Sequence, residues 1–159
     1  LKLLALAECW KIEYRATSAG TISARTVGSD RIIVTGQVER IEACHAVLRR
    51  WLARRGQDTL VPWLARLADE TGLRYAGVSI KGQRTRWGSC SAEGRINLNY
   101  KLLFLPSAWV CYVLIHELCH TVELNHSPKF WDWVRRFEPE ATQLSAAVRQ
   151  AREYVPAWV

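Results

Sequence analysis

The sequence predicts a single α+β domain (residues 1–159) in which a small, twisted antiparallel or mixed sheet packs against helices. Two stretches, 10–35 and 73–100, show the alternation of β-strands, whereas the residues around them repeat apolar side chains at helical steps. The 159 residues, 49% of them hydrophobic, suffice for one sizeable core. We expect N-terminal strands over 1–37, a helical part over 38–72 and a catalytic core over 73–159.

The N-terminal part reads as short strands. Residues 10–18 and 21–35 are rich in β-branched and alternating residues, and Gly28-Ser29-Asp30 provides a hairpin turn within the second stretch. Gly36 closes that stretch. No motif with catalytic or ligand-binding chemistry occurs here.

The pattern then becomes helical. Apolar residues recur at three- and four-residue steps over 38–55 and again over 58–71, and Gly56 between them predicts a break. Gly72 ends the second helix. We interpret His45 as a residue of the helix face and not as a metal ligand.

Residues 73–100 predict two or three strands with a turn at 92–94. Strands are expected at 75–81, 85–91 and 95–100. The last strand alternates cleanly, so that Ile96 and Leu98 share one face. The other face carries three polar side chains, those of Arg95, Asn97 and Asn99.

A strongly apolar helix starting at Pro106-Ser107 carries the motif His116-Glu117-Leu118-Cys119-His120. Histidines four apart lie on one helix face, one turn above the other, and can share a metal ion. Glu117 then leans over the same site, as suits a general base. Burying two histidines and a glutamate among apolar residues is costly unless a metal satisfies them.

A catalytic zinc requires three protein ligands and one open position, and His126 is the candidate for the third ligand. It reaches the metal if the helix ends near Glu123 or Leu124 and the chain turns back at Asn125, which tolerates the left-handed conformation. Ser127 then caps a new helix that Pro128 opens. Cys119 faces away from the histidines and is expected to pack in the core.

The C-terminal part predicts two more helices, from Pro128 to about Phe137 and from Glu140 to about Tyr154. The tail, 155–159, is expected to be extended.

The net charge is +7, which favours an acidic partner such as nucleic acid or nucleotides, although it also suits plain solubility. Five cysteines without a C-x-x-C pair predict free thiols and a cytoplasmic location. The apolar start, 1–7, is too short to span a membrane, so we expect no membrane association; the tail of a signal peptide is the alternative.

Several motifs occur in a fixed order: Arg86-Trp87-Gly88-Ser89-Cys90-Ser91, Ile96-Asn97-Leu98-Asn99, Pro106, the His116–His120 motif, Asn125-His126-Ser127 and Phe130-Trp131. Together they resemble the YgjP-like metallopeptidase family, which is distantly related to the WLM and SprT-type zinc proteases. The resemblance is strong over residues 75–140 and weaker before them.

The resemblance implies a zincin-like fold, in which the sheet lies over the metal helix. It also implies Zn²⁺ held by His116, His120 and His126, with Glu117 as catalytic base. The spacing is also that of metzincins, but Glu123 stands where metzincins have glycine, and a chain without methionine has no Met-turn. We therefore do not assign the chain to the metzincins.

The first hypothesis is a zinc metallopeptidase in which Glu117 activates a zinc-polarised water against a peptide or protein substrate. A strand beside the cleft would bind the substrate by strand addition. Residues near the cleft that would contact the substrate are Arg86, Trp87, Asn97 and Asn99, and the candidates for the oxyanion stabiliser are Arg86, Asn97, Asn99 and Tyr112.

Three alternatives remain open. The family resemblance also implies a nucleoside triphosphate pyrophosphatase, with Arg84, Arg86 or Arg95 holding phosphate. The positive charge and the SprT-like kinship allow a DNA-associated protease. A binding module with a structural zinc is the third, although an intact base at Glu117 argues against it. Nickel or cobalt could enter the same histidine site.

Overall fold

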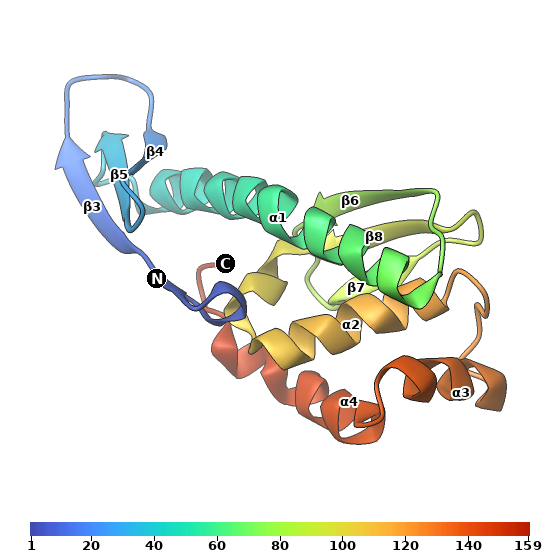
Figure 1. Cartoon of the computed structure of the whole chain (residues 1–159). Coiled ribbons are helices and arrows are strands. Elements are labelled where there is room, and N and C mark those ends of the chain that lie inside the picture. The colour runs from blue at the N-terminus through green and yellow to red at the C-terminus, as the bar shows by residue number, and fades with distance from the viewer.

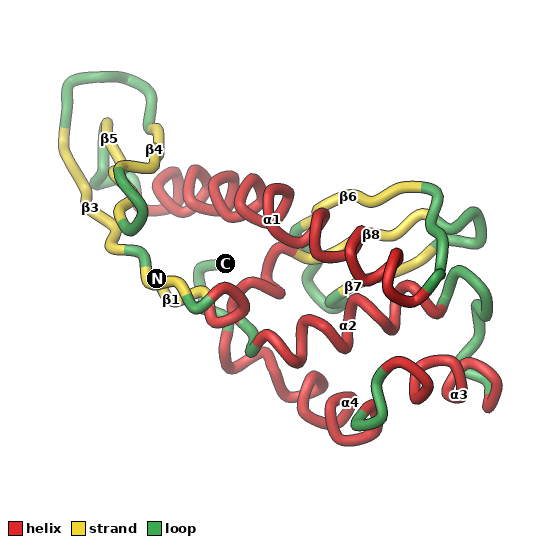
Figure 2. Tube along the Cα trace, in the orientation of Figure 1, coloured by secondary structure: helices red, strands yellow, loops and turns green.

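Two groups of strands lie at opposite ends of one long helix, α1 (Ile41–Thr71), in the computed structural model, which describes residues 1–159 (Figure 1). Three further helices, α2 to α4, lie along the side of the molecule where the second strand group sits (Figure 2). The remaining elements are β1 (Lys2–Leu3), β2 (Glu8–Cys9), β3 (Lys11–Ala16), β4 (Ser23–Val27), β5 (Arg31–Gly36), β6 (Gly77–Lys81), β7 (Gly88–Cys90), β8 (Arg95–Asn99), α2 (Ser107–Cys119), α3 (Pro128–Phe137) and α4 (Ala141–Gln150), with 3-10 turns at Leu4–Leu6, Tyr100–Phe104 and Ala151–Tyr154. The α+β prediction is confirmed.

The N-terminal sheet has the order β3-β5-β4. β4 and β5 form the predicted hairpin around Gly28, whereas β3 pairs with β5 in parallel. The central strand β5 is the buried one, with Ile32, Ile33 and Val34 at 2% exposure or less.

The second sheet has the order β6-β8-β7, with β8 parallel to β6 and antiparallel to β7. As expected, Ile96 and Leu98 of β8 face the core. β7 is shorter than the predicted strand 85–91, because the side-chain amide of Asn99 donates to the carbonyl groups of Gln83 and Arg86 and fixes the residues before β7 as a loop. β7 is consequently a short edge strand with a partner on one side only.

The predicted break at Gly56 is wrong, since α1 continues through it and through Pro62. A Cβ atom at Gly56 would lie 3.3 Å from side-chain carbons of Ile80 and Tyr100. The glycine therefore serves the close approach of α1 to β6 and the following 3-10 turn. This packing offsets its helix cost of about 1 kcal/mol.

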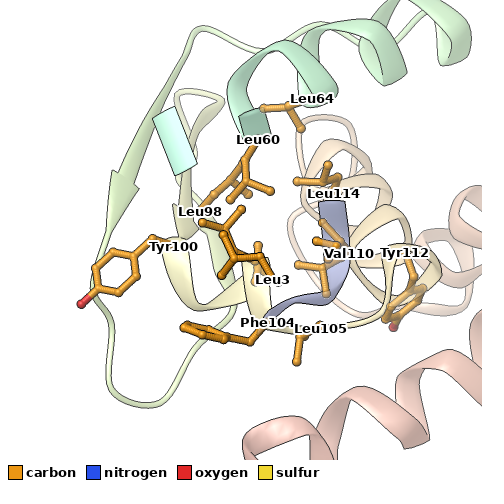
Figure 3. Close-up of a cluster of buried hydrophobic side chains, with 14 of the residues drawn as sticks. Leu3, Leu60, Leu64, Leu98, Tyr100, Phe104, Leu105, Val110, Tyr112 and Leu114 are labelled. Carbon is orange, nitrogen blue, oxygen red and sulfur yellow. The ribbon is translucent and has the colours of Figure 1, made fainter. Parts of the chain in front are cut away.

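The core is formed where α1, β8 and α2 meet. Figure 3 shows Leu60 and Leu64 of α1, Leu98 of β8, and Val110 and Leu114 of α2 converging on one another. All five are fully buried, so the apolar face of α2 is packed in the core together with residues of α1 and β8. None of the helices combines the length and the apolar character that a membrane crossing requires.

The C-terminal tail is not extended as predicted. Val159 N–H donates to the Pro156 carbonyl, which makes a turn. Arg49 donates to the carbonyl oxygen of Trp158 at 2.7 Å and Lys101 to that of Val159 at 2.7 Å. These two cations hold the tail against α1 and the 3-10 turn after β8.

Candidate metal centre

The last turns of α2 bring His116 and His120 together. Their Nε2 atoms lie 3.2 Å apart, as the four-residue spacing predicts. Glu117 follows His116 on the same helix and is only 6% exposed. The helix reaches this point because its apolar residues, among them Val113 and Leu114, are anchored in the core.

His126 reaches the same point from the turn after α2. Its Nε2 atom lies 3.1 Å from Nε2 of His116, and the ligand atoms of all three histidines lie within 4.8 Å of one another. The predicted helix end near residue 123 is wrong, because α2 ends at Cys119 and a non-helical turn follows. Asn125 does not take the left-handed conformation either. The reversal depends instead on His120, whose Nδ1 lies 3.0 Å from the Glu123 carbonyl oxygen.

α3 closes the site with two aromatic rings. Phe130 is fully buried, stacks on His120 at 4.3 Å between ring centroids, and contacts His116 and His126 edge-on. Trp131 stacks on His126 at 6.0 Å. Ser127 caps α3 by accepting from the Phe130 N–H, with Pro128 in the first turn, as predicted. The cap thus fixes the ring that holds the three imidazoles.

His116 and His120 are held in the neutral form. Burial, with the neighbouring histidines, lowers the pKa of His116 to about 3, and burial also lowers the pKa of His120. Because a carbonyl oxygen only accepts, His120 Nδ1 carries the proton and its Nε2 lone pair is free. Neutral imidazole is the form that binds metal ions.

Glu117 is a buried carboxyl group without a partner. Its Oε2 atom has no hydrogen bond, and burial raises its pKa to about 8, against the opposing effect of Arg86. The backbone of Gly88 in β7 lies so close that a Cβ atom there would come within 2.6 Å of Glu117 Oε1. Cys90, also in β7, has a pKa raised to about 11 by burial and by the charge of Glu117.

These features fit a bound metal ion. When three imidazole nitrogens bind one zinc ion in a tetrahedral site, neighbouring nitrogens lie about 3.3 Å apart. The Nε2 atom of His116 lies at nearly this distance from those of His120 and His126. The unpartnered oxygen of Glu117 beside them is the group that a cation and its water would satisfy. Cys119 is fully buried and outside the ligand group, as expected.

Two of the predicted substrate residues line the cleft beside Glu117. Arg86 and Trp87 lie in its wall with Tyr112, and the indole N–H of Trp87 donates to the Val148 carbonyl at 3.1 Å. The Tyr112 hydroxyl lies 3.5 Å from Nδ1 of His116.

The two predicted asparagines lie away from this wall. Asn99 is 2% exposed, and its amide is engaged with the backbone of Gln83, Arg86 and Lys101. Asn97 reaches the Ser89 hydroxyl at 3.4 Å. Asn99 therefore shapes the loop that carries Arg86 and Trp87, and neither asparagine lines the cleft.

No role in the site was assigned from the sequence to three residues that contribute to it. Gly88 approaches Glu117, Phe130 packs among the imidazoles, and Arg149 of α4 lines the cleft. The glycine inside a predicted strand was a usable signal of close backbone approach. Nothing in the sequence marks Arg149, because its position depends on how α4 packs on α2.

A family model for the YgjP-like metallopeptidase domain matches residues 2–151. The chain belongs to the YgjP-like metallopeptidase family. It is accordingly a hydrolase of the metallopeptidase class, and membership implies a catalytic metal, for which the three-histidine group is the available site. Searching curated proteins gave no match.

Solved structures similar to this YgjP-like chain include the metallopeptidase zymogen abylysin of Pyrococcus abyssi, with 27% identity and a TM-score of 0.51. The similarity covers 57% of this chain and 91% of that one. The metallopeptidase zymogen jannalysin of Methanocaldococcus jannaschii has 19% identity and a TM-score of 0.47, covering 55% and 90% of the two chains.

Replacing Gly88 by alanine should displace the Glu117 carboxylate, because the new methyl group would overlap it. We expect peptide hydrolysis to fall about a hundredfold with metal content unchanged, because a shift of about 1 Å in a group that takes part in the reaction costs about this factor. Gly77→Ala in β6 is the matched control, since only the flexible end of Arg95 lies nearby. Equal activity of the two variants would contradict this geometry.

Removing the charge of Arg86 should shift the pH profile of kcat/KM. Arg86 lowers the pKa of Glu117, so Arg86→Gln raises it, and the ionised carboxylate then forms only at higher pH. The acid limb of the profile should move upward in pH. Arg25→Gln in the remote sheet removes the same charge and should leave the limb in place.

Proposed function

We propose that this protein is a zinc-dependent peptidase in which His116, His120 and His126 hold the metal and Glu117 is the general base. The proposal depends on the position of one carboxylate next to three histidines. A buried carboxylate oxygen without a partner lies beside three imidazoles whose nitrogens have the spacing of a shared ligand set.

Zinc, when bound, supplies a Lewis acid that polarises the scissile carbonyl and makes water easier to deprotonate. Glu117 accepts the proton of the attacking water and later delivers it to the leaving nitrogen. Burial raises the pKa of Glu117 to about 8 in the metal-free site, and a cation bound beside it would lower this pKa again by favouring the ionised carboxylate that accepts a proton. Gly88 permits this by leaving room for the carboxylate.

The substrate is expected to bind as an extended segment along β7. This strand pairs with β8 only, so its other edge offers unpaired backbone groups. Gly88, Ser89 and Cys90 line a cleft together with the three histidines, which would bring a paired peptide across the metal.

Three imidazole donors favour zinc among the metals available to proteins, with nickel and cobalt as the competitors. The five cysteines are all free thiols. They support a reducing compartment, and we propose the cytoplasm as the place of action.

Hydrolysis of nucleoside triphosphates is the second candidate, because Arg84 and Arg86 line adjoining clefts beside the metal centre. Arg95, the third predicted phosphate-binding residue, lines neither cleft. The same basic surface supports the DNA-associated version of the protease.

The Glu117→Gln variant should retain zinc and lose peptide hydrolysis by a factor of about 10² to 10⁴, the usual contribution of a general base. Zinc content and cleavage of an unfolded protein would be measured on the same preparations. Glu70→Gln, a surface carboxylate paired with Arg66, is the control and should behave as wild type. Undiminished hydrolysis by Glu117→Gln would disprove the assigned role. Glu117-dependent release of pyrophosphate without proteolysis would favour the nucleotide reaction.

A further inference from the structure

Three arginines line the cleft beside Glu117, and we call this the arginine cleft. Arg86 comes from the loop before β7, Arg149 from α4 and Arg152 from the 3-10 turn that follows. The cleft holds about 380 Å³, which lies within the range of ligand pockets. Glu117, the only acidic group in its wall, is 6% exposed and belongs to the metal centre.

These arginines have no carboxylate partners. None of them takes part in an ion pair within the protein. Arg152 donates to the Arg84 carbonyl, whereas Arg86 and Arg149 make no side-chain hydrogen bonds. The guanidinium groups of Arg86 and Arg149 are therefore free to bind a ligand.

The positive charge continues beyond the arginine cleft into an adjoining groove. Arg86 and Arg152 line both hollows, and the groove adds Arg84 and Lys101 without any acidic residue. Burial lowers the pKa of Lys101, and the nearby cations, Arg152 first, lower it further. This repulsion among the cations of the arginine cleft and the groove indicates that an anion bound in either place would be stabilised.

The aromatic groups of the cleft distinguish between two anionic ligands. Tyr112 is only 4% exposed, and Trp87 is half-buried with its indole N–H bound to the Val148 carbonyl, so the cleft offers no fully exposed aromatic ring on which a nucleic-acid base can stack. Carboxylates, in contrast, need only the forked donors of arginine. The cleft also adjoins β7, along which the extended peptide is expected.

We propose that the arginine cleft selects substrates by binding an aspartate or glutamate side chain of the peptide next to the scissile bond. Arg149 contributes most specifically, since it lines the cleft and makes no side-chain hydrogen bond or ion pair within the protein. This inference rests on the proposed peptidase function. It adds the substrate class, acidic peptides, and a residue that determines specificity.

The test compares binding of short labelled peptides in the Glu117→Gln background, in which cleavage does not interfere. A neutral peptide is compared with versions carrying a single Glu, moved from position to position, or Gln in its place. We expect one position at which Glu binds about tenfold more tightly than Gln, as a charge-assisted hydrogen bond provides. The preference should weaken as salt is added.

Adding Arg149→Gln should abolish the preference for Glu without changing the affinity of the Gln peptide. Arg149→Glu should instead favour Lys at the same position. Arg25→Gln, which removes an equal charge in the remote N-terminal sheet, should keep the preference. A peptide set without any Glu preference, or an Arg149→Gln variant that matches Arg25→Gln, would overturn the inference.

Two further results separate this inference from the proposed function. If zinc-loaded wild type cleaves acidic and neutral peptides with equal kcat/KM, the peptidase function stands and the selectivity is wrong. If acidic peptides bind preferentially but are not cleaved, the proposed function fails and the selectivity stands. The labelled acidic peptide would also be displaced with a nucleoside triphosphate and with unlabelled acidic peptide. If the nucleotide displaces it at the lower concentration, the inference is overturned in favour of a polyphosphate ligand.

Discussion

Three polar groups, His116, Glu117 and His120, are carried by the last turn of a strongly apolar helix, and the rest of the structure is arranged around that constraint. His116 and His120 must stay neutral in their surroundings, and Glu117 has an oxygen atom with no partner inside the protein. Burying such groups is unfavourable by several kcal/mol unless something compensates them. A cation shared by the imidazoles, with the carboxylate beside it, is the compensation that the geometry allows.

The neighbouring elements can be understood as supports for these groups. α1 and β8 pack against the apolar face of α2, and this packing fixes the position of the two histidines on that helix. The cap at Ser127 positions Phe130, and Phe130 packs against all three imidazoles. β7 approaches Glu117 from the opposite side through Gly88. The edge strand is thus both the wall of the site and the expected binding place of the peptide.

Much of this could be predicted from local sequence signals. The four-residue spacing of His116 and His120 places them on the same face of the helix, and Ser127-Pro128 predicts the start of the next helix. What could not be predicted depends on distant contacts. Gly56 resembles a helix breaker but serves close packing, and the chain reversal that places His126 uses the Glu123 carbonyl instead of a left-handed Asn125.

We propose that the three histidines together hold one zinc ion. X-ray absorption at the zinc edge, with metal stoichiometry on the same samples, tests it most directly. We predict one zinc per chain with three imidazole nitrogens at about 2.0 Å, and weaker binding with one imidazole fewer in His126→Ala. A zinc spectrum that is identical in wild type and His126→Ala, or a wild-type protein that binds no metal, would contradict the account.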